Sequence, residues 1–154
     1  MSSVIEERLA QMGVILPPSA PPAANYVPFV KSGKVLYVSG QISSNPGGMI
    51  IGKIGAQLNT QEGYDAARTC AINLLAQVKI ACDGDLDLLD RVVKLTGFVN
   101  STPDFTEQPT VINGASDFLV EVLGESGRHA RSAVSAGALP LGVAVEVEGI
   151  FQLK

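Results

Sequence analysis

The sequence predicts an α+β fold, in which two long helices pack on one face of a mixed β-sheet. Segments with the alternating or continuous apolar character of strands occur at 26–30, 34–41, 91–100, 131–137 and 143–152. Two segments with apolar residues at helical spacing lie between them, which gives the order ββαβαββ. Two helices against one sheet form a two-layer α+β arrangement, and 154 residues are enough to bury its core.

The N-terminal residues predict a short helix that precedes the sheet domain. Within 3–12, apolar residues recur at helical spacing, and Gly13 ends the pattern. The prolines of 17–22 favour a stiff, extended connector. We therefore divide the chain into an appended helix and connector, 1–22, and an α+β domain, 23–154.

The domain is expected to begin with a β-hairpin. Its two strands, 26–30 and 34–41, flank a turn at Ser32 and Gly33. The second run is almost continuously apolar, as in a strand at the centre of a sheet. The glycine-rich stretch 43–58 predicts a long loop or an irregular strand pair.

Both long helices carry start and stop signals. Asn59 and Glu62 have the spacing of a capping box, and the acidic run 83–87 follows the helix as a solvated loop. Pro109 suits the first turn of the second helix, which ends at Gly124. The apolar stripes are Tyr64, Ala67, Cys70, Ala71, Leu74, Leu75 and Val78 in the first helix, and Ile112, Ala115, Leu119, Val122 and Leu123 in the second.

The last two strands are predicted to form a closing hairpin that concentrates charge. Val134 is expected to face the core, which places Arg131 on the opposite, helix-free face. Val143, Val145 and Val147 share a face, so Glu146 and Glu148 also belong to the helix-free one. Two interpretations stay open. The charges form a cross-strand surface salt bridge, contributing about 0–1 kcal/mol, or the arginine binds a small carboxylate beside an acid or base.

The helix-free face is expected to be apolar as well. The alternation assigns Leu36, Val38 and Ile150 to it, and nothing else in the chain remains to cover these side chains. Self-association through this face is the simplest solution. The charges would then lie near subunit interfaces, where partial burial makes them chemically useful.

Composition argues against several classes of protein. A net charge of −4 and scattered basic residues do not favour nucleic-acid binding. The acidic N-terminus is unlike a signal peptide, and no apolar run reaches the length of a membrane span. Cys70 and Cys82, about 18 Å apart on one predicted helix, are too distant for a disulfide, which fits reduced thiols in a cytoplasmic protein. With one histidine and no Cys-x-x-Cys, no metal site is expected.

Several polar residues are ordinary when taken singly. Tyr26, Ser39 and Asn113 suit a strand start, a strand and a helix, whereas Gly40 indicates a close approach to backbone or ligand. His129 is an acid or base by type, but no Ser or Cys has the sequence context of a triad partner.

Taken together, these segments resemble the Rid family, the YjgF-like enamine/imine deaminases, over about residues 23–152. The resemblance includes a 13-residue step from Tyr26 to Ser39 and a 15-residue step from Arg131 to Glu146. The segments that carry it are Val38 to Ile42, Asn73 to Leu75, Val93 to Asn100, Pro103 to Phe105, Ala130 to Val134, Leu139 with Pro140, and Val145 to Glu148.

The resemblance implies a chorismate-mutase-like fold and a homotrimer with a site in each inter-subunit cleft. It implies hydrolysis of 2-imino or 2-enamino acids, such as 2-aminoacrylate, to 2-oxo acids and ammonia, without metal or cofactor. Arg131 would clamp the substrate carboxylate and Glu146 would activate the attacking water, while Glu148 stays structural. The substrate would also contact Tyr26, Ser39, Gly40, Asn113 and Ala133.

The sequence departs from the family pattern at a few positions. His129 replaces a proline, Ala133 a cysteine and Ala66 a glutamine. Two other functions remain as alternatives: a non-catalytic protein that binds small carboxylates such as 2-oxo acids, and an endoribonuclease. The acidic charge and the lack of a histidine-based acid/base pair argue against the endoribonuclease.

Overall fold

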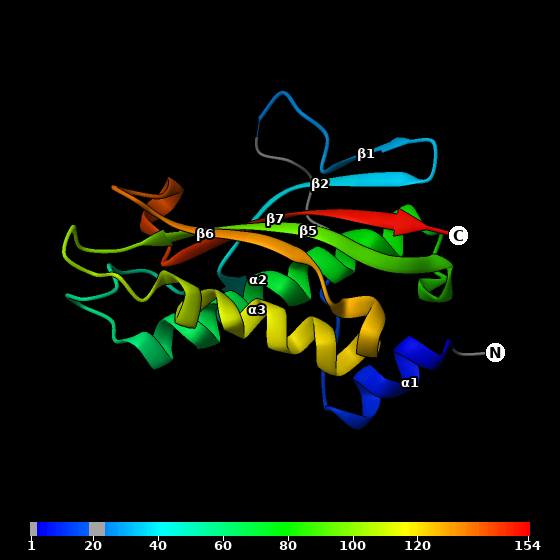
Figure 1. Cartoon of the computed structure of the whole chain (residues 1–154), viewed down its shortest axis with the longest axis horizontal. Helices are drawn as coiled ribbons and strands as arrows, with labels where there is room; N and C mark the ends of the chain where they lie inside the picture. Colours follow the sequence, from blue (N-terminus) through cyan, green and yellow to red (C-terminus); the bar gives the residue numbers. More distant parts are fainter. Residues whose placement is uncertain (1–2, 19–23) are drawn as a thin grey trace.

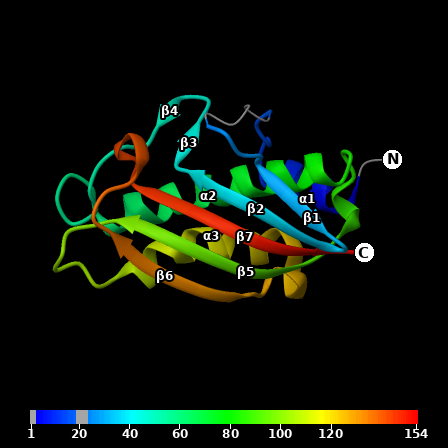
Figure 2. The same ribbon diagram turned by 90° about the horizontal axis from the view of Figure 1, so that it is seen from above.

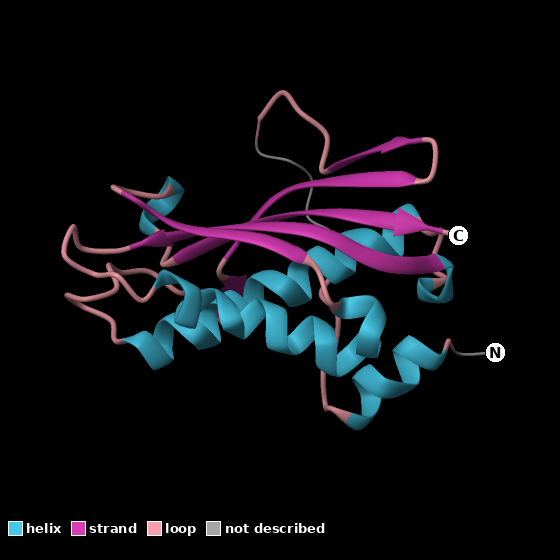
Figure 3. Cartoon of the chain, in the orientation of Figure 1, coloured by secondary structure: helices cyan, strands magenta, loops and turns pink. Residues whose placement is uncertain are grey.

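A five-stranded mixed sheet forms one layer of the structure, and two long helices form the other (Figures 1 and 3). The computed structural model describes residues 3–18 and 24–154. The strand order is β1-β2-β7-β5-β6, with β5 and β6 parallel and the other pairs antiparallel. The main strands are β1 (Phe29–Ser32), β2 (Val35–Ile42), β5 (Leu89–Asn100), β6 (Ala130–Ala136) and β7 (Val145–Leu153).

The helices α2 (Thr60–Ala81) and α3 (Gln108–Leu123) cover one face of the sheet, as predicted. The capping box of α2 is confirmed: Asn59 Oδ1 accepts from the Glu62 N–H at 2.8 Å, and Glu62 Oε1 accepts from the Asn59 N–H at 3.2 Å. The two helices touch at backbone level, since a Cβ at Gly114 would lie 1.9 Å from the Tyr64 carbonyl oxygen.

The predicted closing hairpin is wrong, because β6 and β7 are not neighbours. Strand β5 lies between them, parallel to β6 and antiparallel to β7. The chain passes from β5 through α3 to β6, and a strand–helix–strand unit brings its two strands together in parallel. The turn before β7 does form, as the short 3-10 helix η3 (Pro140–Gly142), but it carries the chain across β5 to the far side.

Leu36 and Val38 lie in the helix-covered core, with 0% and 3% of their surface exposed, so their assignment to the open face is also wrong. The four residues from Val35 are all apolar, so their alternation could not identify the buried side. Tyr37 is the residue of this strand that points away from the helices, and it is 48% exposed.

The open face of the sheet is nevertheless apolar, through other residues. Val30 and Tyr37 are partners across β1 and β2, and Ile150 is the partner of Tyr37 on β7. Val134 is 46% exposed on β6, next to Phe98 on β5. Figure 2 looks onto this face, with α2 and α3 behind the strands.

The N-terminal helix α1 (Val4–Gln11) packs against the domain rather than standing apart from it. Ile5 and Leu9 are buried in the common core. Asp87, in the short 3-10 helix η1 (Leu86–Leu88), accepts from the Val4 N–H at 3.2 Å, and the Arg8 guanidinium donates to the Val122 carbonyl at 3.0 Å. The predicted connector, 17–22, lies partly outside the described residues.

The remaining segments agree with the sequence. The stretch 43–58 contains one small strand pair, β3 (Ser44–Asn45) and β4 (Gly48–Met49), and is otherwise irregular. The turn 124–127 after α3 forms the 3-10 helix η2 (Gly124–Gly127). Cys70 and Cys82 are free and buried. Among the described residues, none of the helices combines the length and apolar character needed to cross a bilayer.

Candidate functional site

Arg131 lies on the edge strand β6 and reaches toward α3. Its Nη1 donates to Asn113 Oδ1 at 2.8 Å and to Ser116 Oγ at 3.1 Å, and its Nη2 lies 3.4 Å from the Pro109 carbonyl oxygen. Its neighbour on β5 is Leu95, which is fully buried under the helices. Arg131 is therefore on the helix-covered face, and its predicted position on the open face is wrong.

The difference arises at Val134, which the sequence predicts to lie on the core face of β6. In the structure Val134 is on the open face, whereas Ala133 packs against the core. On an edge strand the outer residues are covered least, so a single valine does not reveal which face is buried. Counting from Ala133 instead, Arg131 falls on the helix side.

The hydrogen bonds of Arg131 leave one edge of its guanidinium for a ligand. Both Nη1 hydrogens are used by Asn113 and Ser116, and one Nη2 hydrogen points to Pro109. The contacts that the described residues provide leave Nε–H and one Nη2–H, and the Nε and Nη2 nitrogens form one edge of the guanidinium. That pair of donors matches the two oxygens of a carboxylate.

Glu146 lies on the open face of β7, as predicted, and is half-buried. Its β-sheet partners are Ile42 on one side and Phe98 on the other. A Cβ placed on Gly40 would come within 2.9 Å of its carboxyl carbon, so Gly40 makes room for the carboxylate. The sequence predicts a close approach of the Gly40 backbone to another strand or to a ligand, and the neighbour in the structure is the Glu146 side chain on β7.

The surroundings of Glu146 favour its protonated form. Burial raises the pKa of the Glu146 carboxyl, and the nearby Glu148 carboxylate raises it further. In the described part of the chain no side chain or backbone N–H donates a hydrogen bond to it. A carboxylate held in this way is a stronger base than one in water.

Arg131 and Glu146 do not meet within one chain. They lie on strands separated by β5 and on opposite faces of the sheet. The cross-strand salt bridge considered from the sequence is accordingly absent between these described residues.

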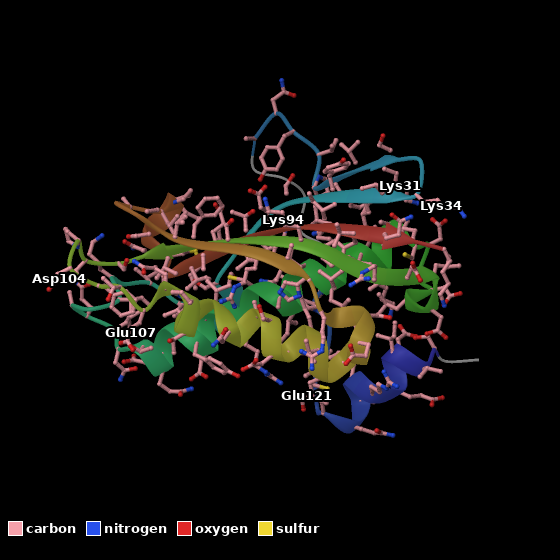
Figure 4. The ribbon with its side chains drawn as sticks, in the orientation of Figure 1. Lys31, Lys34, Lys94, Asp104, Glu107 and Glu121 are labelled. Carbon is pink, nitrogen blue, oxygen red and sulfur yellow. The ribbon has the colours of Figure 1, made fainter. Side chains whose placement is uncertain are left out.

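Glu148 belongs to a separate, shallow pocket on the open face. The pocket has a volume of about 240 Å³ and is lined by Tyr37, Val38, Lys94, Thr96, Glu148, Gly149 and Ile150. Figure 4 shows Lys94 on the side of the sheet away from the helices. Within the described residues there is no group of three side chains suited to hold a metal ion.

The other predicted residues divide between these two locations. Tyr26 is exposed in the segment before β1, and the Ser39 hydroxyl donates to the Val27 carbonyl oxygen of that segment at 3.1 Å. Gly40 follows Ser39 and adjoins Glu146. Asn113 hydrogen-bonds Arg131, and Ala133 is two residues farther along β6 on the same face.

Sequence reasoning missed Ser116 at the Arg131 end, and it named His129 only as an acid or base by type. Ser116 Oγ lies 2.9 Å from His129 Nε2, and His129 Nδ1 lies 2.6 Å from the Gly127 carbonyl oxygen. The sequence context indicates no triad partner for His129, and the structure pairs its ring with Ser116. No sequence pattern links the two, because Ser116 lies on α3 and His129 lies in the segment between η2 and β6.

The fold and the two sets of residues define a chorismate-mutase-like α+β protein. A family model described as "YjgF/chorismate_mutase-like, putative endoribonuclease" matches residues 6–151. The chain thus belongs to the YjgF family, also called Rid.

Individual relatives agree with this membership. Protein TCP17 of Trypanosoma cruzi is 50% identical over 99% of this chain and 96% of its own length. A crystal structure from Agrobacterium tumefaciens, of a protein described as having unknown function, is 49% identical with a TM-score of 0.91, covering 98% of this chain and 93% of that one. TdcF of E. coli, crystallised with bound serine, is 25% identical with a TM-score of 0.59, covering 90% and 93% of the two chains.

Proposed function

We propose that this protein hydrolyses small 2-imino or 2-enamino acids to 2-oxo acids and ammonia. The observation that carries the proposal is the Arg131 guanidinium, which three contacts to α3 orient while its Nε/Nη2 edge remains available for a carboxylate. Glu146, a half-buried carboxyl with a raised pKa, supplies the base.

The complete site is formed between two copies of the chain. One copy contributes Arg131, Asn113 and Ala133 from the edge strand and α3. Another contributes Glu146 with Gly40, and Tyr26 and Ser39 from the neighbouring segment. This division follows from the opposite faces on which Arg131 and Glu146 lie.

The apolar open face supports assembly, since half-exposed Val30, Tyr37 and Val134 gain free energy when another copy covers them. We propose the homotrimer that family resemblance implies, with an equivalent cleft between each pair of neighbours. In a trimer the edge strand of one subunit approaches the open face of the next, which brings Arg131 toward the partner's Glu146.

Hydrolysis of an imine requires little more than a positioned substrate and a base. Arg131 holds the substrate carboxylate, and the Glu146 carboxylate takes a proton from water as the water oxygen bonds to the imine carbon. That proton passes to the imine nitrogen, which gives a carbinolamine. The hydroxyl proton is then transferred to the nitrogen, the carbon–nitrogen bond breaks as the 2-oxo acid forms, and ammonia leaves. The proposed reaction draws on no metal or cofactor. Free, buried Cys70 and Cys82 support a reducing compartment such as the cytoplasm.

A small amino-acid-like substrate is supported by the relative TdcF, whose crystal structure holds serine. A 2-imino acid presents the same carboxylate beside a nitrogen-bearing carbon. Such a ligand needs one carboxylate clamp and little additional surface, in agreement with the few polar residues at the site.

The proposal is tested by replacing Arg131 with alanine. We expect Arg131→Ala to lower kcat/KM for 2-aminoacrylate generated in situ by about a hundredfold or more, because the paired carboxylate loses a bidentate, charged partner. The size of the assembly, measured by analytical ultracentrifugation, should not change. Arg128→Ala removes a nearby surface arginine that pairs with Glu125 and should leave activity intact.

Two outcomes would contradict the proposal. Full activity in Arg131→Ala would show that the clamp is not used. A wild-type protein that binds 2-oxobutyrate but never speeds imine decay would be a non-catalytic carboxylate-binding protein of the same fold.

A further inference from the structure

A chain of three hydrogen bonds extends from Arg131 to the backbone of the turn after α3. It runs from Arg131 Nη1 to Ser116 Oγ at 3.1 Å, from Ser116 to His129 Nε2 at 2.9 Å, and from His129 Nδ1 to the Gly127 carbonyl oxygen at 2.6 Å. Ser116 belongs to α3, Arg131 to β6 and Gly127 to the short helix η2, and His129 lies in the segment between η2 and β6. Ser116 on α3 thus joins Arg131 to His129 from outside the segment 127–131.

The direction of each bond follows from its atoms. A carbonyl oxygen only accepts, so Nδ1 of His129 carries the proton and Nε2 of the neutral ring has a lone pair. Ser116 then donates its hydroxyl hydrogen to Nε2 and accepts from Nη1 of Arg131. Burial and the charge of Arg131 lower the pKa of His129, in keeping with a neutral ring.

We propose that Ser116 and His129 are positioning residues, which orient the Arg131 guanidinium so that its Nε/Nη2 edge faces the substrate carboxylate. This inference rests on the proposed function and explains how the clamp is held. Arg131 would otherwise sample several rotamers, and binding would have to select one of them at a cost in free energy. The three hydrogen bonds fix the Nη1 end of the guanidinium before a ligand binds.

Two independent features support a positioning role. Ser116 and Asn113 are one helical turn apart and hold the two hydrogens of the same Nη1, so the guanidinium plane is defined rather than merely attracted. His129 is half-buried and has its second nitrogen fixed by Gly127, so its own ring cannot rotate freely. The chain of hydrogen bonds therefore ends on a backbone carbonyl and not on another mobile side chain.

The first experiment measures 2-oxobutyrate binding and 2-aminoacrylate hydrolysis in the assembled protein. We expect Ser116→Ala to raise both Kd and KM about tenfold, the effect of one hydrogen bond to a charged group, with kcat within about twofold of wild type. Ser116→Thr keeps the hydroxyl and should recover most of the affinity. Thr110→Ala removes an exposed hydroxyl from the same helix and serves as the matched control.

A double-mutant cycle separates positioning from a general structural role. In an Arg131→Lys background, whose ammonium lacks the guanidinium fork, Ser116→Ala should change Kd by less than about twofold. A purely structural role of Ser116 predicts the same tenfold loss in both backgrounds, and that result would overturn the proposal.

The hydrogen bonds of His129 can be observed directly, because it is the only histidine in the chain. Nitrogen-15 NMR of its imidazole should show the Nδ1–H tautomer in the wild type, with the Nε2 shift changed by Ser116→Ala. The Nε2–H tautomer would overturn the proposal.

If the wild type fails to bind 2-oxobutyrate, the proposed function fails. If the wild type binds it and folded Ser116→Ala binds it equally well, only the positioning inference fails.

Discussion

Arg131 and Glu146 are charged residues of one sheet, but their surroundings differ in nearly every respect. Arg131 is tied to α3 through Asn113, Ser116 and Pro109, whereas the Glu146 carboxyl faces Gly40 with no hydrogen-bond donor among the described residues. The chain orients its cation and leaves its carboxylate poorly solvated. This difference fits the proposed function, in which Arg131 holds the ligand and Glu146 is the base.

The two residues also differ in what they contribute to the stability of the fold. The contacts of Arg131 link β6 to α3 and contribute to the fold. Glu146 carries a raised pKa, which means that its charged form is less stable in the folded protein than in water. Such a cost is expected where a side chain serves chemistry rather than structure.

The largest predicted effect is the loss of the base. Glu146→Gln keeps the shape of the side chain but cannot accept a proton, so kcat should fall about 10²- to 10⁴-fold. KM should change little, because Arg131 still holds the carboxylate. Steady-state kinetics with 2-aminoacrylate made in situ give both constants.

Glu148→Gln is the matched control for that variant. Glu148 is exposed on the same strand and face, two residues away, and we expect its loss to change kcat by less than about threefold. If Glu148→Gln were the more damaging substitution, the roles assigned to the two carboxylates would be reversed.

A smaller effect is expected when the space beside Glu146 is filled. The Cβ of Gly40→Ala would lie 2.9 Å from the carboxyl carbon, so the flexible end of Glu146 has to move. Displacing a base by about 1 Å costs roughly ten- to a hundredfold in kcat.

The control for this substitution is Gly137→Ala. No atom lies within 4 Å of a Cβ at Gly137, so kinetics and thermal stability should be unchanged. A Gly40→Ala protein with wild-type kcat, and with the wild-type melting temperature, would show that the carboxylate does not need its present position.

The smallest predicted effect concerns stability as a function of pH. Because the pKa of Glu146 is raised, its contribution to the free energy of unfolding is fully present below the ordinary carboxyl pKa, where the side chain is protonated. That contribution is lost as the pH rises through the pKa of the folded state. Glu146→Gln should thus unfold with a free energy higher than wild type by less than about 1 kcal/mol near pH 8. Below about pH 4 the two should coincide.

Urea unfolding at both pH values, at equal protein concentration, measures this difference. An advantage of Glu146→Gln that is larger in acid than at pH 8 would mean that the pKa of Glu146 is lowered by a partner. Glu146 would then resemble Arg131, and the contrast between the two residues would disappear.

Local features of the fold were predictable from the sequence, whereas the neighbours of each strand were not. The capping box at Asn59 and the glycine beside Glu146 depend on residues close in sequence or on a single backbone requirement, and both were found. The pairing of β6 with β5 depends on the crossover through α3. The turn residues near Leu139 wrongly favoured a hairpin of β6 and β7. A turn shows that the chain changes direction, but it does not determine which strand the next segment pairs with.

The candidate site shows the same division. The open-face position of Glu146 followed from valines at alternate positions, two of which, Val145 and Val147, lie on the central strand β7. The face of Arg131 was misassigned because Val134, the largest apolar residue of the edge strand β6, is exposed, whereas the core side of that strand carries the smaller Ala133. The pairing of Ser116 with His129 escaped notice because it joins α3 to the segment before β6, a tertiary contact without a sequence pattern.

Each proposed site combines Arg131 of one chain with Glu146 of another. The direct test mixes Arg131→Ala and Glu146→Gln chains, each inactive alone, by co-expression in equal amounts. A site is intact when an Arg131-bearing chain adjoins a Glu146-bearing one, so random mixing in a ring should restore about a quarter of the wild-type kcat per site. Mixed assemblies no more active than the separate variants would contradict the claim, because both residues would then have to come from the same chain.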